Sequence, residues 1–359
     1  MSNFETREEA AARPIDKEAA DAFWRCFLEK EDAYFQMDLP ELLDALALLM
    51  EAHAPALAME VSGDRDDSER ELILTAHGDK AQFHSLEVLQ RATPNLKRFS
   101  SVIAFRQRMN DPDFGINMDQ MELLAKDIQV ALFSDRGLVG LELAFARTIS
   151  SAQMEQAKHM AFIMLDHVIG EYDFAVRVGF VEFVDQVSQS AENRCSLDEL
   201  PETFDRFLHV VLGYTWNWPD ESGKSDWVML TAASVNEHGR PNIVSVRREV
   251  RSLALRADLA HRLDVSVDVG DAESLDRARE LQEALCQLME INRDAILVLT
   301  MVLMDEGQRV CRFYTGDPHG WVSKIQQKSR LYGFHSPRID IAFDPSWDAY
   351  LSHLPETAT

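Results

Sequence analysis

Paired cysteines, long apolar runs and an excess of positive charge are all absent from this sequence of 359 residues. The four cysteines form no Cys-x-x-Cys pair, which argues against a thiolate zinc site or a disulfide framework, so we expect reduced, buried thiols. The longest apolar run, residues 295–304, is far shorter than the roughly 20 residues of a membrane span. The N-terminus is polar and acidic and lacks the apolar core of a signal peptide. These absences predict a soluble cytoplasmic protein that has no contact with membranes.

Positive charge is scarce, with 36 Lys and Arg against 61 Asp and Glu, a formal net charge of −25. Nucleic-acid binding relies on basic side chains that neutralise phosphates, so a nucleic-acid partner is not expected. The acidity instead favours solubility and attraction to a basic protein partner. A simpler interpretation is the general acidity of bacterial cytosolic proteins.

Signatures of common enzyme classes are also missing. The chain has no G-x-x-x-x-G-K-[ST] loop, no strand followed by G-x-G-x-x-G, no G-x-S-x-G elbow and no H-E-x-x-H helix. His159 and His167 lie two helical turns apart, too far to share one ion. Cys311 stands beside Arg312, which could lower a thiol pKa, but an inert core cysteine is the simpler interpretation. The acidic segment 64–69 lacks calcium-loop spacing. No cofactor and no metal are predicted.

The length predicts about two domains. We expect a flexible arm over residues 1–15, an N-terminal α+β domain over 16–187, a polar linker over 188–196 and a C-terminal α+β domain over 197–359. The N-terminal domain opens with two helices and then shows strand, strand, helix, strand, twice over. A strand is expected over 174–184 in the second of these repeats.

The C-terminal domain gives the clearest pattern. Leu263, Val265 and Val267 alternate with polar residues, as in a half-buried strand. An amphipathic helix, two strands, a second helix and a last strand follow, which gives the order βαββαβ of the split βαβ arrangement. The sequence therefore predicts an α+β protein of two domains, each with a ferredoxin-like antiparallel sheet and helices packed on one face.

Two stretches of this domain carry a resemblance to a known family. They are Cys311-Arg312-Phe313-Tyr314-Thr315 followed by Asp317, and the tail 344–351, Asp-Pro-Ser-Trp-Asp-Ala-Tyr-Leu. Residues 225–354 resemble the bacterial domain of unknown function numbered 695, a family without an assigned activity. Its organisation is distantly similar to that of the family of regulator of ribonuclease E activity B, a noncatalytic inhibitor. The resemblance implies a fold and a regulatory role rather than a reaction.

Three groups of residues are candidates for binding. Trp216 and Trp218 lie in an aromatic loop that either forms a recognition surface or, as we favour, folds back to cap the sheet. Arg247 and Arg248 point to opposite faces of one strand and either guard its edge or contact an anion or RNA. The motifs of the resemblance contribute Phe313, Tyr314, Trp347 and Tyr350.

Together these patterns favour a noncatalytic module that binds or regulates a protein partner. One alternative is an immunity protein whose acidic surface neutralises a basic toxin. Another is an enzyme whose site assembles from distant residues, which a deep cleft between the domains, lined by His and Asp with perturbed pKa values, would favour. The oligomeric state is not predicted.

Overall fold

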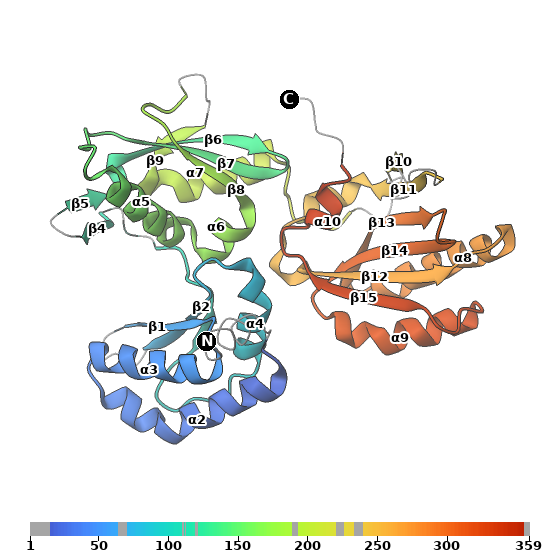
Figure 1. The fold of residues 1–359 in the computed structure, drawn as a ribbon, viewed down its shortest axis with the longest axis horizontal. Coiled ribbons are helices and arrows are strands. Elements are labelled where there is room, and N and C mark those ends of the chain that lie inside the picture. The colour runs from blue at the N-terminus through green and yellow to red at the C-terminus, as the bar shows by residue number, and fades with distance from the viewer. Residues whose placement is uncertain are drawn as a thin grey trace, which may run out of the picture. The chain divides into compact units, whose positions relative to one another are not determined.

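The protein is an α+β molecule that divides into two compact units, Met1–Phe207 (unit 1) and Leu208–Thr359 (unit 2) (Figure 1). The computed structural model describes residues 15–63, 70–109, 111, 113–118, 121–188, 193–219, 226–232 and 240–354. The predicted arm lies almost wholly outside these residues, as does the acidic segment 64–69. Within the described residues, no helix combines the length and the apolar character that crossing a membrane requires.

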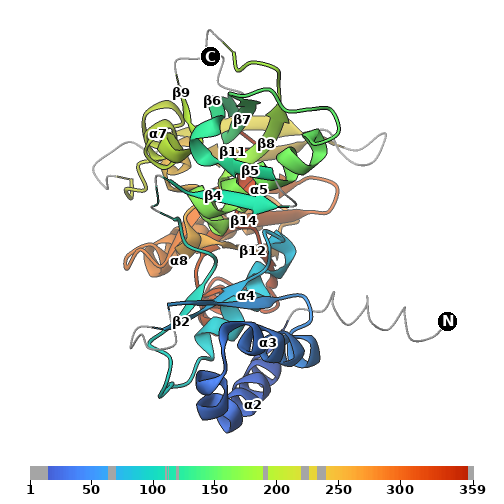
Figure 2. The same ribbon diagram turned by 90° about the vertical axis from the view of Figure 1, so that its left-hand side faces the viewer.

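Unit 1 opens with two helices, α2 (Lys17–Gln36) and α3 (Leu39–His53). Asp16 and Asp38 cap them, each accepting a backbone N–H from the first turn. Figure 2 shows α2 and α3 side by side, near the helix α4 (Phe83–Arg91). A three-stranded sheet accompanies them in the order β1 (Ala58–Ser62), β2 (Glu71–Thr75), β3 (Val102–Ala104).

A second sheet of unit 1 has four strands in the order β8-β7-β6-β9. These strands are β6 (Ile128–Asp135), β7 (Leu138–Phe145), β8 (Val178–Phe183) and β9 (Arg194–Ser196). The helices α5 (Met154–Ile169) and α6 (Glu171–Arg177) connect β7 to β8, and α7 (Leu200–Arg206) follows β9. A small hairpin of β4 (Gly115–Met118) and β5 (Met121–Leu124) precedes β6.

Unit 1 differs from the antiparallel sheet that we expected. The pairs β2/β3 and β7/β8 are parallel, because a helical crossover joins the two strands of each pair and no other strand lies between them. The expected strand over 174–184 begins only at Val178, because residues 171–177 form α6.

The predicted linker over 188–196 does not mark the end of unit 1. Part of it is β9, which pairs with β6, and α7 belongs to the same unit. The division between the units falls after Phe207 instead.

Unit 2 contains one six-stranded sheet in the order β10-β11-β13-β14-β12-β15, in which all neighbouring strands are antiparallel. The strands are β10 (Trp227–Ala232), β11 (Asn242–Arg247), β12 (His261–Asp268), β13 (Ala295–Leu303), β14 (Gln308–Thr315) and β15 (Arg338–Phe343). The helices α8 (Ala272–Met289) and α9 (Pro318–Leu331) pack on one face, and the short helix α10 (Asp348–Leu351) follows β15.

The element order of unit 2 from β12 to β15 is the predicted βαββαβ. Helix α8 connects β12 to β13, and β14 lies between these two strands; α9 connects β14 to β15, and β12 lies between those two. Leu263, Val265 and Val267 share one buried core with Leu285 of α8 and Ile325 of α9. The period-two alternation therefore places this core correctly.

Candidate functional site

The aromatic loop of unit 2 folds back onto the same unit. The Trp216 backbone N–H donates to the Ser252 carbonyl at 2.9 Å, and its indole Nε1 donates to the Ala254 carbonyl at 3.3 Å. The guanidinium carbon of Arg256 lies 6.0 Å from the centre of the Trp218 ring. Both tryptophans are half-buried, so the loop packs against the segment around 252–256 instead of projecting its rings into solvent.

The four aromatic candidates from the resemblance motifs are fully buried. Phe313 lies in the core beneath α8 and α9. Tyr314 stacks on Trp347 with ring centres 4.1 Å apart, and the Trp347 indole donates to the Leu259 carbonyl at 3.0 Å. The Tyr350 hydroxyl donates to the Arg247 carbonyl at 2.8 Å. These side chains attach the C-terminal segment to the sheet and leave no exposed surface for a partner.

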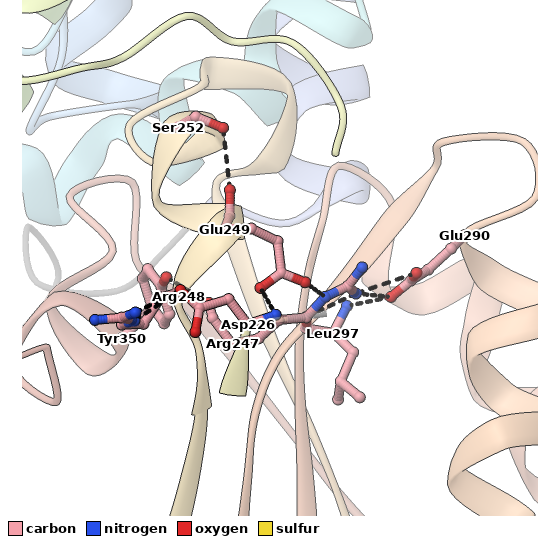
Figure 3. A network of polar contacts seen from close by, with 8 residues as sticks. All are labelled: Asp226, Arg247, Arg248, Glu249, Ser252, Glu290, Leu297 and Tyr350. Carbon is pink, nitrogen blue, oxygen red and sulfur yellow. Dashed lines mark hydrogen bonds and ion pairs between the residues drawn. The ribbon is translucent and has the colours of Figure 1, made fainter. Parts of the chain in front are cut away.

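Arg247 and Arg248 belong to separate ion pairs (Figure 3). Arg247 donates to Glu249 at 2.7 Å and to Glu290 at 3.0 Å, whereas Arg248 pairs with Asp226 at 2.6 Å. Each guanidinium therefore already has a carboxylate partner, and the two do not form one basic patch.

Cys311 is buried, and burial raises the pKa of its thiol to about 11 in spite of the nearby Arg309. A thiol with this pKa is protonated at neutral pH, so Cys311 is not an activated nucleophile.

The described residues of unit 1 line a cavity of about 660 Å³ that is open to solvent and that sequence reasoning does not find. One side of helix α5, residues of α6 and β8, and two loops form its wall. Figure 1 shows the position of these three elements in unit 1. The polar residues of the wall are His77, Arg106, His159, Asp166 and His167. The larger apolar ones are Phe162, Ile163, Phe174, Val178, Phe180 and Val181.

Helical periodicity brings the α5 residues of the wall together. Positions 159, 162, 163, 166 and 167 follow the spacing at which side chains share one face of a helix. Gly170 ends α5 with φ +83°, and a Cβ atom there would lie 3.3 Å from the Arg106 carbonyl oxygen. Only glycine fits this turn without strain, and α6 starts directly after it.

A buried carboxylate, Glu171, positions the two loops of the wall. Its Oε1 accepts the backbone N–H groups of Ala76 at 2.8 Å and Gly78 at 3.0 Å, and its Oε2 accepts that of Arg106 at 3.0 Å. His77 and Gly78 both have positive φ, so the chain turns sharply at this point. The result is that His77 and Arg106 reach the cavity from segments about thirty residues apart.

Arg106 is the centre of charge at the polar end. Its guanidinium pairs with Glu60, with Nε 3.2 Å from Oε2, and also contacts Asp166 of α5. Burial would raise the pKa of Glu60, but the hydrogen bond and charge of Arg106 outweigh it and leave this pKa below its usual value. Burial and then the charge of Arg106 lower the pKa of His167, so its imidazole is neutral at neutral pH.

The wall does not have the geometry of a metal site with three protein ligands. A protein site for a metal ion brings the donor atoms of at least three His, Cys, Asp or Glu side chains together. Among the described residues of unit 1, no three such donor atoms lie within 4.8 Å of one another. In the part of the chain that the structure describes, the imidazoles of His77, His159 and His167 make no hydrogen bond to a carboxylate, which is the contact that would orient a histidine as a general base.

The chain matches no family model, no curated protein and no solved structure. The resemblance of residues 225–354 to the family of unknown function therefore stays a prediction. The cavity in unit 1 lies outside that stretch.

Proposed function

We propose that this protein is a noncatalytic binding or regulatory protein of the cytoplasm, in which unit 1 holds a small organic molecule. The observation that carries the proposal is the cavity of about 660 Å³. Its size falls in the range of roughly 300–1,000 Å³ that is usual for ligand sites. Its combination of an apolar, aromatic side with a few polar groups is also characteristic of such sites.

Binding agrees better with this wall than catalysis does. The described residues that line the cavity include no hydroxyl, thiol or amine side chain that could act as a nucleophile. Asp166, the acidic residue of the lining, already contacts Arg106. The enzyme alternative would require one of the histidines to act as an acid or base without an orienting partner.

A ligand-observed NMR screen with a mixed fragment library tests the proposal. Ala175 lines the cavity, so Ala175→Trp fills part of it. Ala52→Trp makes the same exchange at an exposed position of α3 and serves as the control. We expect fragments that bind the wild type and Ala52→Trp but not Ala175→Trp, provided that both variants keep the wild-type circular dichroism. A library without any fragment that distinguishes the filled variant from the control would overturn the proposal.

A protein partner is a second candidate, and the distribution of charge favours it. Residues 1–207 carry 39 Asp and Glu against 20 Lys and Arg, whereas residues 208–359 carry 22 against 16. A basic protein, such as the toxin of an immunity pair, would therefore be attracted chiefly to unit 1. Capture from the native host should then recover basic proteins, and their association rate should fall steeply with added salt. Complexes whose association is independent of salt would argue against this candidate.

A further inference from the structure

The polar end of the cavity holds more negative than positive charge. Glu60 and Asp166 both pair with one guanidinium, that of Arg106. The buried carboxylate of Glu171 accepts the backbone N–H of Arg106, and its charge also acts on the Arg106 guanidinium. The lowered pKa of His167 keeps that imidazole neutral. The charges of three carboxylates thus act on one permanent cation, and of these carboxylates Asp166 lines the cavity itself. In a place partly withdrawn from water such an excess of negative charge has a strong effect.

One acceptor at this end has no donor. Asp166 contacts Arg106 through Oδ2, but its Oδ1 is buried and has no hydrogen-bond partner in the structure. The side chain of Asp166 as a whole is 14% exposed to solvent. A buried carboxylate oxygen without a donor is costly, because water no longer solvates it and nothing replaces the water. A ligand that brings an N–H donor would remove this cost once a small turn of the carboxylate brings Oδ1 to the surface of the cavity.

The rest of the wall presents aromatic rings. Phe162 and Phe180 are each 40% exposed, which is high for phenylalanine, and Phe162 lies 6.3 Å from Phe174 between ring centres. Rings of this kind accept an apolar or aromatic body, and their faces attract cations. The same site therefore offers contacts to both ends of an aromatic or alkyl amine.

We infer that the cavity selects an organic cation, a protonated amine carried on an apolar body. The ammonium group donates to Asp166 and offsets the excess of carboxylates, while the body lies among Phe162, Phe174 and Phe180. This inference rests on the proposed ligand-binding function. The net negative charge of unit 1 agrees with it, because the field of the unit raises the local concentration of cations.

The charge of the fragments that bind tests this inference. The library should contain equal numbers of ammonium, neutral and carboxylate fragments on matched aromatic bodies, for example 3-phenylpropylamine, 3-phenylpropanol and 3-phenylpropanoate. Among fragments that bind the wild type but not Ala175→Trp, we expect the ammonium members to predominate. A majority of neutral or carboxylate fragments would overturn the inference and leave the proposed function standing. A screen without cavity-dependent fragments would overturn both.

Two substitutions locate the selectivity. Asp166→Asn removes one charge and one acceptor from the cavity, so ammonium fragments should lose affinity by roughly tenfold or more while neutral fragments keep theirs. Glu155→Gln removes one charge from the same helix at a side chain that is 87% exposed, and it should change neither. Equal losses of ammonium and neutral fragments in Asp166→Asn would show that the aspartate only supports the fold, which would contradict the inference.

Discussion

At the scale of single residues, Glu171 shows how one buried side chain can organise a site. It accepts three backbone N–H groups from two loops that carry His77 and Arg106. Glu171→Ala leaves these donors without a partner, which should lower the free energy of unfolding of unit 1 by about 3 kcal/mol, near 1 kcal/mol for each. Hydrogen exchange of α5 peptides measures this. Glu155→Ala on the exposed side of α5 should cost far less, and equal costs would contradict the role of Glu171.

His167 makes the stability of unit 1 depend on pH. Its pKa lies below the unfolded value of 6.5 because of burial and the charge of Arg106, with Glu60 acting in the opposite direction. Between these two pKa values the unfolded chain binds a proton at His167 that the folded unit does not, so the contribution of His167 to stability falls as pH decreases below about 6.5. Glu60 titrates lower still, because its own pKa is depressed from 4.5.

Thermal unfolding from about pH 7.5 to about pH 5.5 tests this effect. Glu87, whose pKa burial raises to about 6, acts in the opposite direction in both proteins, so the difference between their profiles reports His167. His167→Gln should lose less stability over this interval than the wild type, because glutamine does not titrate. Identical pH profiles of the two proteins would show that His167 does not govern the acid side of the stability curve.

At the scale of elements, Arg247, the last residue of strand β11, forms an ion pair with Glu290 at the end of α8. Glu290, the C-cap residue of α8, accepts the backbone N–H of Leu297 at 2.8 Å and the guanidinium of Arg247 at 3.0 Å. The register of β13 against β14 shifts directly after Leu297, so Glu290 satisfies a backbone group at an irregular point of the ladder. The side chain of Arg247 is 14% exposed and that of Arg248 is 48% exposed.

This contrast predicts different costs for two adjacent arginines. Arg247→Ala leaves two half-buried carboxylates unpaired and should destabilise unit 2 by about 2 kcal/mol. Arg248→Ala breaks one exposed pair and should cost no more than about 0.5 kcal/mol. Hydrogen exchange in β13 peptides gives both values, and the reverse order would contradict the network in Figure 3.

The elements that the sequence predicts well are those with a strong local pattern. The alternation of Leu263, Val265 and Val267 and the run at 295–304 identify β12 and β13 because each strand buries one or both faces. Helix α6 and strand β9 escape prediction because they are short and their sequences carry no clear period. Their conformations depend on Gly170 before α6 and on the pairing of β9 with β6.

At the scale of the whole molecule, the cavity escapes prediction for a related reason. Its wall combines loops near positions 77 and 106 with residues 159–181, and no local pattern reports their meeting. The mixture of His, Phe and Asp on one face of α5 is the available signal. Conversely, the aromatic motifs of the sequence make Tyr314 and Trp347 candidates for binding. Their rings stack on one another and are fully buried, so they belong to the core of unit 2.

Charge is also a property of the whole molecule, and it is shared unequally. Unit 1 carries a formal charge of −19, from 39 acidic and 20 basic residues, and unit 2 carries −6, from 22 and 16, which together give −25.

Repulsion among like charges destabilises a compact state, and salt screens it once the Debye length falls below the spacing of the charges. Raising NaCl from about 0.05 M to about 0.5 M should therefore increase hydrogen-exchange protection more in peptides of unit 1 than in those of unit 2. Glucose at equal osmolality controls for effects of solute that do not involve charge. An equal gain in both units, or a larger one in unit 2, would show that the acidity of unit 1 is already balanced by its ion pairs.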